Sequence, residues 1–513
     1  MDRNVVIVGA GPGGLASAML AARMGCKVTV LERAGQVGGR TSTLETDGFR
    51  FDRGPTFFLY PDILRSIFEA CGRSLDDEVE LTRLDPNYRL VFEGGGQVDS
   101  TCHVERLKEQ IATISPEDAA HVDAYMADNK VKLDRFRPIL ETPFLRHRDF
   151  FKLPLLELLP LMRPWATVDR DLKRFFNDER IRLAFSFQSK YLGMSPFRCP
   201  SLFTILAYME YEFGVFHPTG GCGAVSEAMA RVAREMGVEI ALEEPVEEIL
   251  LDGRRASGVR TNRRQLDCDA LIVNADFAQA MHTLVPDGAR TRWTDRKLAR
   301  KKYSCSTFML YLGLEGECPG LAHHTIFLAD GYAEHLKDID TRFELTQNPS
   351  FYVQNPCVTD STMAPPGCTA LYVLVPVPHM HDSIDWSVEQ PGFRRQTLHQ
   401  LEEHLGIENI ESRIRVEHVC TPADWAADLN IYRGATFSMA HSLDQMLSLR
   451  PRNRFEDLDG VYLTGGGTHP GSGLPTIFQS AKIATDLLAE DLGIADSESY
   501  PAAVMPEALQ KTG

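Results

Sequence analysis

A glycine-rich turn near the start of the chain leaves few choices of fold. Residues 5–8 (VVIV) form a continuous β-branched run, which is typical of a parallel strand buried on both faces. Gly9, Gly11 and Gly14 follow in the spacing Gly-x-Gly-x-x-Gly. This spacing permits a tight turn, lets the backbone approach a pyrophosphate and lets the next helix pack closely. The turn therefore predicts an α/β unit that binds a nucleotide at a helix N-terminus.

The residues after the turn complete the nucleotide-binding pattern. Residues 15–24 are rich in alanine and predict a helix, Gly25 ends it, and residues 27–31 predict a second strand. Glu32 stands at the end of that strand, where a carboxylate accepts hydrogen bonds from ribose hydroxyls. The alternative, a nucleotide-free turn with a salt-bridged Glu32, is much less favoured because the whole context is present.

The segment after Glu32 favours FAD over NAD as the nucleotide. Gly39 and Arg40 supply flexible backbone and a guanidinium suited to phosphate oxygens. Residues 48–56 then predict a short strand and a turn. Together these residues resemble the FAD-binding amino-terminal segment of the amine oxidase and carotenoid desaturase superfamily. The resemblance implies cofactor contacts from Arg33, Gly39, Arg40, Gly54, Pro55 and Thr56.

Nucleotide-domain signatures return in the middle of the chain. Residues 216–223 (FHPTGGCG) lead into a predicted helix over 224–236. The strands predicted after it cover residues 238–242, 246–251, 258–260 and 271–276. This order resembles the middle FAD segment of bacterial phytoene desaturase-like enzymes. The resemblance implies that Val246 places its backbone beside the adenine and that Asn274 also contacts the cofactor.

A third signature lies near the end of the chain. Residues 460–464 predict a strand, and a glycine-rich run leads from it into a helix predicted over 477–488. Glycines beside a helix N-terminus suit a diphosphate and the electron-rich edge of a reduced flavin. In the resembling family this segment holds the ribityl chain and isoalloxazine, which implies contacts from Gly466, Gly467, Gly473, Leu474, Pro475 and Thr476. Many relatives have Pro-Gly where this chain has Pro475-Thr476, which leaves the subfamily open. Residues 432–453 also resemble the carotenoid desaturase pattern.

The predicted fold class is α/β, with a discontinuous Rossmann-like FAD-binding domain, an inserted α+β substrate domain and a helical membrane-associating part. The FAD domain is predicted over residues 1–75, 215–285 and 426–493, and the substrate domain over 76–214 and 286–425, with a solvated tail over 494–513. Strands of the substrate domain are expected at 307–312, 350–353 and 370–375. The aromatic side chains of residues 168–212 are interpreted as core in preference to a ligand tunnel.

Composition and charge exclude several classes of function. The chain has 513 residues, with 54 basic and 71 acidic side chains and a net charge of −17, so we expect no nucleic-acid partner. Eleven scattered cysteines without Cys-x-x-Cys spacing predict reduced thiols and no metal site. No secretion signal is expected before the first strand, which predicts a cytoplasmic protein. No motif typical of hydrolysis or metal catalysis stands out.

Two segments are candidates for peripheral contact with the inner face of the cell membrane. Residues 153–165 (LPLLELLPLMRPW) are too few to span a bilayer, and they predict an amphipathic entry helix. The basic run over residues 290–302 predicts a site for anionic headgroups. A proline-rich loop and a solvated helix face are equally favoured alternatives. A homo-oligomer is left open.

The resemblance implies an FAD-dependent desaturase that acts on a phytoene- or diapophytoene-like isoprenoid. Flavin N5 takes a hydride from an allylic carbon, and a proton leaves the neighbouring carbon. We assign no catalytic side chain, and we expect His217 and His469 to make only backbone hydrogen bonds within their turns. The alternatives are a carotenoid end-group or squalene-type oxidase, a retinol-like polyene saturase, a non-catalytic prenyl-lipid carrier related to GDP dissociation inhibitors and, least favoured, an amine oxidase.

Overall fold

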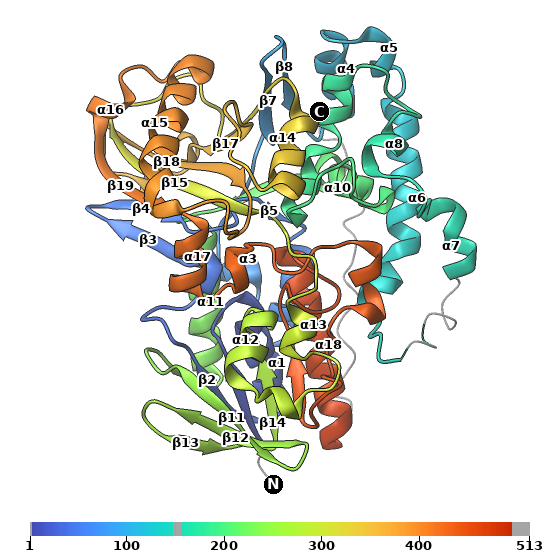
Figure 1. Ribbon diagram of the computed structural model, residues 1–513, viewed down its shortest axis with the longest axis vertical. Helices are drawn as coiled ribbons and strands as arrows, with labels where there is room; N and C mark the ends of the chain where they lie inside the picture. Colours follow the sequence, from blue (N-terminus) through green and yellow to red (C-terminus); the bar gives the residue numbers. More distant parts are fainter. Residues whose placement is uncertain (1–2, 147–148, 150–154, 495–513) are drawn as a thin grey trace.

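Five parallel strands from three separate stretches of the chain form the sheet in the lower half of Figure 1. The computed structural model of the protein describes residues 3–146, 149 and 155–494. Across the sheet the strands are β10 (Glu239–Ala241), β2 (Lys27–Leu31), β1 (Asn4–Val8), β14 (Ala270–Val273) and β20 (Val461–Leu463). Val8 lies beside both Leu31 and Val273. The carboxyl ends of three neighbouring strands therefore meet at one edge of this sheet.

The β-branched run of β1 covers both faces of the sheet because alternate side chains point in opposite directions. Val5 and Ile7 pack in the core formed with α1 (Pro12–Arg23), α11 (Cys222–Glu235) and α18 (Leu474–Leu492). Val6 and Val8 pack in a second core, which includes α12 (Phe277–Leu284) and the antiparallel strands β11 (Val246–Asp252) and β12 (Arg255–Thr261). Strand β13 (Gln265–Asp267) pairs with β12. Burial on both faces was the prediction from this run, and it is confirmed.

Two helices begin earlier than the sequence pattern predicts. Helix α1 starts at Pro12, and α18 starts at Leu474 with Pro475 in its first turn. Proline suits this position because its missing N–H would have no intrahelical partner in any case. The glycines before each helix therefore lie directly at the helix N-terminus.

A seven-stranded sheet forms the core of the upper left half of Figure 1. Its order is β19 (Ile414–Cys420), β15 (Ser306–Glu315), β18 (Cys368–Val377), β17 (Phe351–Gln354), β16 (His324–Leu328), β7 (Tyr88–Phe92) and β8 (Gln97–Ser100). Neighbouring strands are antiparallel except β16 and β7. One face packs with α15 (Trp386–Leu405) through residues such as Leu310 and Leu401. The opposite face turns Tyr311 and Tyr372 towards Phe49 and Phe51 of β4 (Phe49–Asp52).

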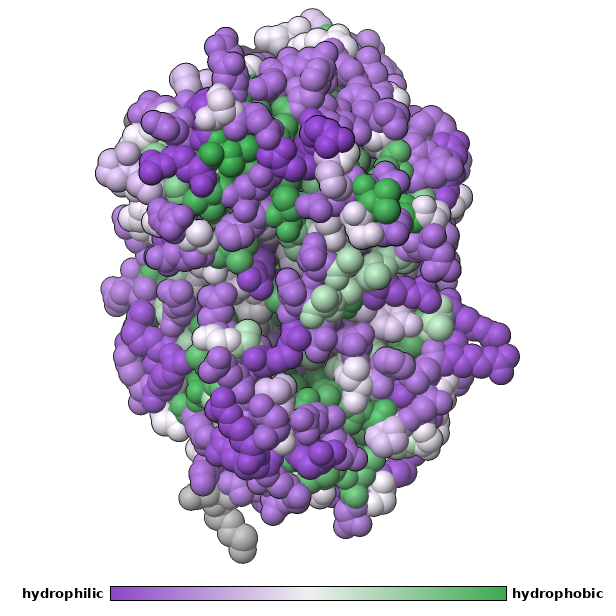
Figure 2. Space-filling view, turned by 60° about the vertical axis from the view of Figure 1, so that its left-hand side comes forward, coloured by the Kyte–Doolittle hydropathy of each residue, from purple (hydrophilic) through white to green (hydrophobic). Residues whose placement is uncertain are grey.

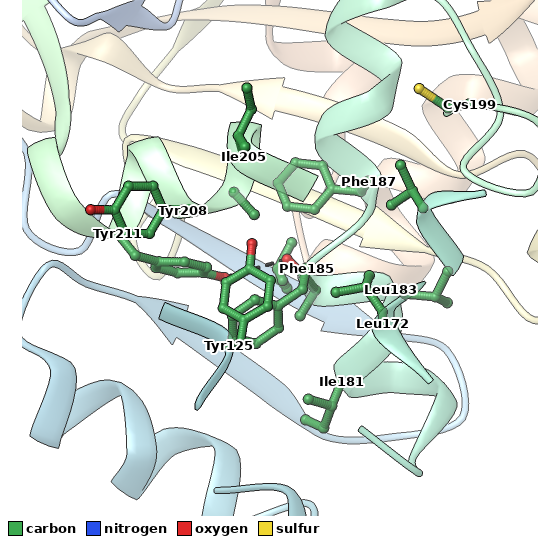
Figure 3. Close-up of a cluster of buried hydrophobic side chains, with 14 of the residues drawn as sticks. Tyr125, Leu172, Ile181, Leu183, Phe185, Phe187, Cys199, Ile205, Tyr208 and Tyr211 are labelled. Atoms are coloured by element: carbon green, nitrogen blue, oxygen red, sulfur yellow. Dashed lines mark hydrogen bonds between the residues drawn. The ribbon is translucent and has the colours of Figure 1, made fainter. Parts of the chain in front are cut away.

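Helices fill the upper right of Figure 1 and hold an aromatic core. They are α4 (Val104–Ala112), α5 (Pro116–Ala119), α6 (Val122–Glu141), α7 (Leu155–Met162), α8 (Val168–Leu172), α9 (Glu179–Ala184) and α10 (Ile205–Phe213). Figure 3 shows Tyr125, Phe185 and Tyr211 gathered in this core, with the Phe185 ring centroid 4.7 Å from Tyr125 and 4.9 Å from Tyr211. Phe176 and Tyr208 are buried in the same cluster. The interpretation as core is confirmed for these side chains, whereas Phe187 and Tyr191 of the same segment line a cavity.

Shorter elements connect the two halves and the helices. They are β3 (Thr43–Thr46), β5 (Phe58–Leu59), α2 (Asp62–Ala70), α3 (Leu75–Glu78), β6 (Leu81–Arg83), β9 (Val215–Pro218), α13 (Asp295–Leu298), α14 (Tyr332–Lys337), α16 (Ile410–Arg413) and α17 (Pro422–Leu429). Strands β5, β9 and β6 form a small sheet. The whole is a mixed α/β fold, as predicted.

The structure describes most of the two candidate membrane segments. No helix within residues 3–146 and 155–494 is both long enough and apolar enough to cross a bilayer. Residues 153–154 of the predicted entry helix, and the tail from residue 495, lie outside the described residues. Helix α7 covers residues 155–162 of this segment, and it lies at the right-hand edge of Figure 1, away from both large sheets.

Ion pairs within the protein occupy part of the basic run over residues 290–302, and the anion site predicted there stays a prediction. Arg290 is buried and pairs with Asp287 and Asp295, whose carboxylate oxygens lie 3.3 Å and 2.9 Å from its guanidinium. Arg292 pairs with Glu456 at 3.2 Å, and Lys302 pairs with Asp444 at 3.1 Å. These three cations are neutralised within the protein, so they do not offer free positive charge to a headgroup.

A charge network joins α6 to the chain around α8. Lys132 is fully buried, and its Nζ lies 2.7 Å from an Asp171 oxygen and 3.1 Å from an Asp128 oxygen. Arg163 Nη2 lies 2.9 Å from the other oxygen of Asp128. Burial raises the pKa of Asp128, but hydrogen bonds and charges from Arg163 and Lys132 outweigh it and lower the pKa to about 2. A buried cation next to α8 therefore depends on this carboxylate.

We predict that Asp128→Asn destabilises the protein in a pH-dependent way. The depressed pKa contributes stability that is fully present above about pH 4 and is lost as the pH falls through about 2. The free energy of unfolding should therefore fall by roughly 2 kcal/mol at pH 7, with a smaller loss at pH 3. Urea unfolding at the two pH values measures this. The matched control is Asp123→Asn, an exposed partner of Lys108 on the same helix, whose loss should cost less than about 1 kcal/mol. An equal loss at both pH values for Asp128→Asn would contradict the account.

Candidate functional site

A cavity of about 630 Å³ lies where the edge of the parallel sheet meets the inner face of the upper sheet. Its lining draws on residues from the first, middle and last thirds of the chain. Figure 2 shows the surface hollowed between the upper and lower halves, with apolar side chains in and beside the hollow. The cavity is the place where the predicted site residues can be tested for proximity.

The glycine turn at the sheet edge is closed so tightly that only glycine fits. Gly9 has φ +96°, and a Cβ on it would lie 2.3 Å from the carbonyl oxygen of Asn274. A Cβ on Gly14 would lie 2.0 Å from the carbonyl oxygen of Gly9. Gly11 is the N-cap of α1 and lines the cavity, so the N-terminus of the helix opens into it. Free N–H groups and the positive end of the helix dipole suit a phosphate there.

Glu32 is held at the end of β2 by backbone donors. Its Oε2 accepts a hydrogen bond from the Ala10 N–H at 2.7 Å, and its Oε1 accepts one from the Ala34 N–H at 2.8 Å. Each carboxylate oxygen can accept more than one hydrogen bond. The side chain lines the cavity and is therefore oriented to accept further hydrogen bonds from hydroxyl groups.

Two arginines of the first segment cross to the last third of the chain. Arg40 Nη1 donates to the Thr436 carbonyl at 2.7 Å, and Arg33 Nη2 donates to the carbonyl of Asp428. Burial lowers the pKa of Arg40, an effect that the nearby charge of Asp276 opposes. Burial raises the pKa of Asp276, which also accepts a hydrogen bond from the Gln279 N–H at the start of α12. This pair places opposite charges on the cavity wall.

Arg450 supports the glycine-rich turn before α18 from below the surface. It is fully buried, and its guanidinium donates to the carbonyls of Gly466 at 2.7 Å, Thr468 at 3.1 Å and Met439 at 3.2 Å. Burial lowers its pKa to about 10. Sequence reasoning noted the stretch around Arg450 without assigning it a role. A charged residue surrounded by Pro and Asn in a loop gives no local sign of burial.

The structure brings the predicted site residues together with three exceptions. The residues that line the cavity are Gly9, Gly11, Glu32, Arg33, Gly39, Arg40, Gly54, Pro55, Thr56, Val246, Asn274, Gly466, Gly473, Leu474 and Pro475. Gly14, Gly467 and Thr476 do not line it. Gly467 packs against Phe277, where a Cβ would lie 2.7 Å from the Phe277 Cβ. The Thr476 hydroxyl donates to the Gly473 carbonyl at 2.8 Å, so it braces its own turn.

The wall contributed by the upper sheet is mostly aromatic and aliphatic. Alternate residues of β16, β17 and β18 face the cavity, among them Ile326, Tyr352 and Leu374, while their neighbours such as Val353 and Val373 pack towards α15. Phe57 and Tyr191 add aromatic rings. The sequence predicted these strands but not which face lines the cavity. Side chains alternate between the two faces of a strand, so the alternation could have identified the residues on that face.

The two histidines set aside from the sequence remain away from the cavity lining. His217 Nε2 lies 3.0 Å from the Asp360 carboxylate, so its partner is a side chain and not the expected backbone group. His469 is buried with its ring 5.2 Å from Phe144, and burial lowers its pKa to about 3.

Comparison with known proteins identifies the family. The sequence profile described as flavin containing amine oxidoreductase matches residues 12–489. The chain belongs to this family. It is 40% identical to a 4,4'-diapophytoene desaturase (4,4'-diapolycopene-forming) of Methylomonas sp, over 95% of each chain. It is 38% identical to an all-trans-zeta-carotene desaturase of Myxococcus xanthus, over 97% of this chain and 96% of that protein.

A solved structure shows the same fold. An oxidoreductase from Methanosarcina mazei superimposes with a TM-score of 0.63 at 17% identity, over 94% of this chain and 100% of that one. The predicted resemblance to the amine oxidase and carotenoid desaturase superfamily is confirmed. The flavin predicted from the segment after Glu32 is the cofactor that the family description names.

We predict that Arg450→Met weakens the flavin site from beneath. Three backbone carbonyls would lose their buried donor, which should lower the free energy of unfolding by about 3 kcal/mol and reduce the amount of FAD retained after gel filtration. Arg454→Met is the matched control, because Arg454 pairs with Asp491 at the surface and its loss should cost less than about 1 kcal/mol. Unchanged FAD retention and stability in Arg450→Met would show that the turn needs no such support.

Proposed function

We propose that this protein is an FAD-dependent desaturase of a long-chain isoprenoid of the phytoene or diapophytoene type. The observation that carries the proposal is one cavity with two unlike walls. One wall has the glycine turns, Glu32 and Arg40, and the other has apolar and aromatic side chains of the upper sheet. Names of relatives at 40% and 38% identity over nearly the whole chain support the same reaction.

The residues that we propose for FAD follow the length of the cofactor along the lower wall. The diphosphate fits against Gly9, Gly11 and the N-terminus of α1, with the ribose hydroxyls at Glu32. The backbone of Val246 lies by the adenine, and Asn274 lines the cavity beside Gly9. Gly466, Gly473 and the N-terminus of α18 face the isoalloxazine. In this proposal the Rossmann-like domain is discontinuous, with segments 1–75, 215–285 and 426–493.

The division of the cavity fits removal of hydrogen from a hydrocarbon. When bound, FAD would accept a hydride from an allylic carbon of the substrate, while a proton leaves the adjacent carbon. The residues of this chain orient the polyene against that wall and exclude water from it. Apolar residues such as Ile326 and Leu374 give a hydrocarbon the contacts it needs, since burying apolar surface is favourable by about 25 cal/mol per Å².

The experiment that tests the proposed reaction is turnover of defined substrates. We expect purified, FAD-loaded protein to convert phytoene or diapophytoene in lipid vesicles into a product with a longer conjugated chromophore, measured by absorbance and chromatography. Squalene and a retinol-like polyene are the comparison substrates. Oxygen incorporation, saturation of a double bond, or protein that holds no flavin would each point to one of the alternatives and would contradict desaturation.

We also propose that the protein meets its substrate at a membrane surface through α7 and the residues that follow it. Trp165 is 67% exposed and Leu159 is 39% exposed, so two large apolar side chains of this segment are exposed to solvent. Both lie on or just after α7, which projects from the helical part (Figure 1). Tryptophan suits the membrane–water interface because it combines an apolar ring with a polar N–H.

We predict that Trp165→Asp lowers binding to phospholipid vesicles by about tenfold, because a large apolar ring contributes about 1.5–3 kcal/mol when it leaves water. Flavin content should stay unchanged, since Trp165 does not line the cavity. Co-sedimentation with vesicles measures the effect. Val388→Asp is the matched control, because Val388 is 68% exposed on α15, far along the chain from α7. Equal loss of vesicle binding in both variants, or in neither, would contradict the assignment of this surface.

A further inference from the structure

The hydroxyl of Tyr352 is the best-connected polar group on the apolar wall of the cavity. Its oxygen lies 2.7 Å from the Thr56 hydroxyl and 2.8 Å from Nδ1 of His324. Thr56 and Tyr352 both line the cavity, and Thr56 belongs to the segment assigned to the cofactor. Tyr352 therefore lies at the seam between the proposed cofactor wall and the proposed substrate wall.

His324 is a buried base that the proposed function does not use. It is 0% exposed on β16, and the ring of Phe57 stacks on it at 4.1 Å with an angle of 12°. Its Nε2 has no hydrogen-bond partner in the described residues. Its ring centroid is 4.5 Å from that of His323, and the ring centroid of His323 is 4.6 Å from that of His217. His217 Nε2 in turn lies 3.0 Å from the Asp360 carboxylate. A buried polar group of this kind needs a reason, because burial without a partner is costly.

The hydrogen-bond directions around Tyr352 suit the transfer of a proton. With the proton of His324 on Nε2, its Nδ1 accepts the hydrogen bond that the Tyr352 hydroxyl donates. The Thr56 hydroxyl then donates to the Tyr352 oxygen, whose remaining lone pair is open to a further donor. A proton that reaches the Tyr352 oxygen can thus displace the hydroxyl proton onto His324.

The desaturation chemistry creates a proton that must leave an apolar site. As the hydride leaves one carbon, the C–H bonds of the next carbon become strongly acidic, so a weak base is sufficient to accept the proton in the same step. Burial raises the pKa of Tyr352 and, together with His323 and His217, holds the pKa of His324 well below its usual value. The neutral form of His324 is consequently favoured before turnover, so its Nδ1 is free to accept a proton.

On the basis of the proposed function, we propose that Tyr352 receives the proton lost by the substrate while its own hydroxyl proton moves to Nδ1 of His324. The substrate C–H bond breaks, and its electron pair becomes the second bond of the new C=C. The hydride and its two electrons are accepted by FAD. His324 then holds the transferred proton as an imidazolium when the step is complete. Tyr352 is the catalytic residue. Thr56 positions it, and His324 accepts its hydroxyl proton.

A second buried acid gives a competing candidate beside Tyr88, whose ring lies 6.1 Å from that of Phe57. Glu210 accepts hydrogen bonds from Tyr88 at 3.0 Å and Gln188 at 3.1 Å, and burial raises its pKa to about 7. Glu210 does not line the cavity, whereas Tyr352 does. The structure therefore favours Tyr352, and Glu210→Gln is a matched control that alters a buried titratable group near the same ring.

The test uses anaerobic single turnovers of the FAD-loaded full chain, with loss of the flavin's visible absorbance as the signal. The substrate is phytoene or diapophytoene, whichever the wild type converts, deuterated either at the carbon that gives the hydride or at the carbon that gives the proton. We expect Tyr352→Phe to slow flavin reduction by about a hundredfold and His324→Asn by about tenfold or more, because general base catalysis contributes 10²–10⁴-fold. Asparagine keeps an acceptor for the Tyr352 hydroxyl but cannot take its proton.

The position of the isotope effect separates catalysis from structure. In Tyr352→Phe, deuterium at the proton-giving carbon should now slow the reaction more than it does in the wild type, because loss of the proton has become limiting. A variant that only disturbs packing would slow both substrates alike. Glu210→Gln should keep the wild-type rate and pattern.

The outcomes distinguish this inference from the proposed function. If the wild type reduces its flavin with an isoprenoid but Tyr352→Phe and His324→Asn stay within about twofold of it, the inference is wrong and the desaturase remains. An unchanged isotope pattern in slowed variants, or a slowed Glu210→Gln, would also overturn it. If none of the tested isoprenoids reduces the flavin of the wild type, the proposed function fails and the inference fails with it.

Discussion

The backbone contact between the first glycine turn and the strand that arrives from the middle of the chain underlies the rest of the site. Gly9 and Gly14 leave no room for a Cβ because Asn274 and the turn itself occupy that space. This closure sets the N-terminus of α1 at the sheet edge and brings Asn274 beside Gly9. The third stretch joins through β20, which pairs with β14. A cofactor wall assembled this way requires the full chain to fold before it exists.

The two walls of the cavity divide the work between charge and apolar surface. The lower wall offers helix N-termini, a fixed carboxylate and the opposite charges of Arg40 and Asp276, all of which suit the polar parts of a dinucleotide. The upper wall is one face of an antiparallel sheet whose other face packs on α15. Polar groups on this side of the cavity include the Tyr352 hydroxyl, which bonds to Thr56, and the amine of Lys190. Such an arrangement holds a hydrocarbon without binding it by specific polar contacts.

Local patterns in the sequence were sufficient for the cofactor wall and insufficient for the substrate wall. Glycine spacing, β-branched runs and Glu32 carry their meaning within about 30 residues, which is the length of one βαβ unit. Tyr352 and His324 come together only because β16 and β17 are neighbours in the sheet, a pairing that no local pattern encodes. The burial of Arg450 is likewise not encoded locally, since its guanidinium donates to carbonyls of two other loops, at Met439 and Gly466. The domain boundaries and the individual cofactor contacts stay predictions.

The most direct test of this account is an experimental structure of the full chain with FAD and an unreactive long-chain polyene. The account predicts the diphosphate at Gly11 and the N-terminus of α1, the isoalloxazine near Thr56 and Gly473, and the polyene along Ile326 and Leu374 with Tyr352 within hydrogen-transfer reach of its chain. Density for the flavin outside this cavity, or a polyene bound away from the upper sheet, would contradict it.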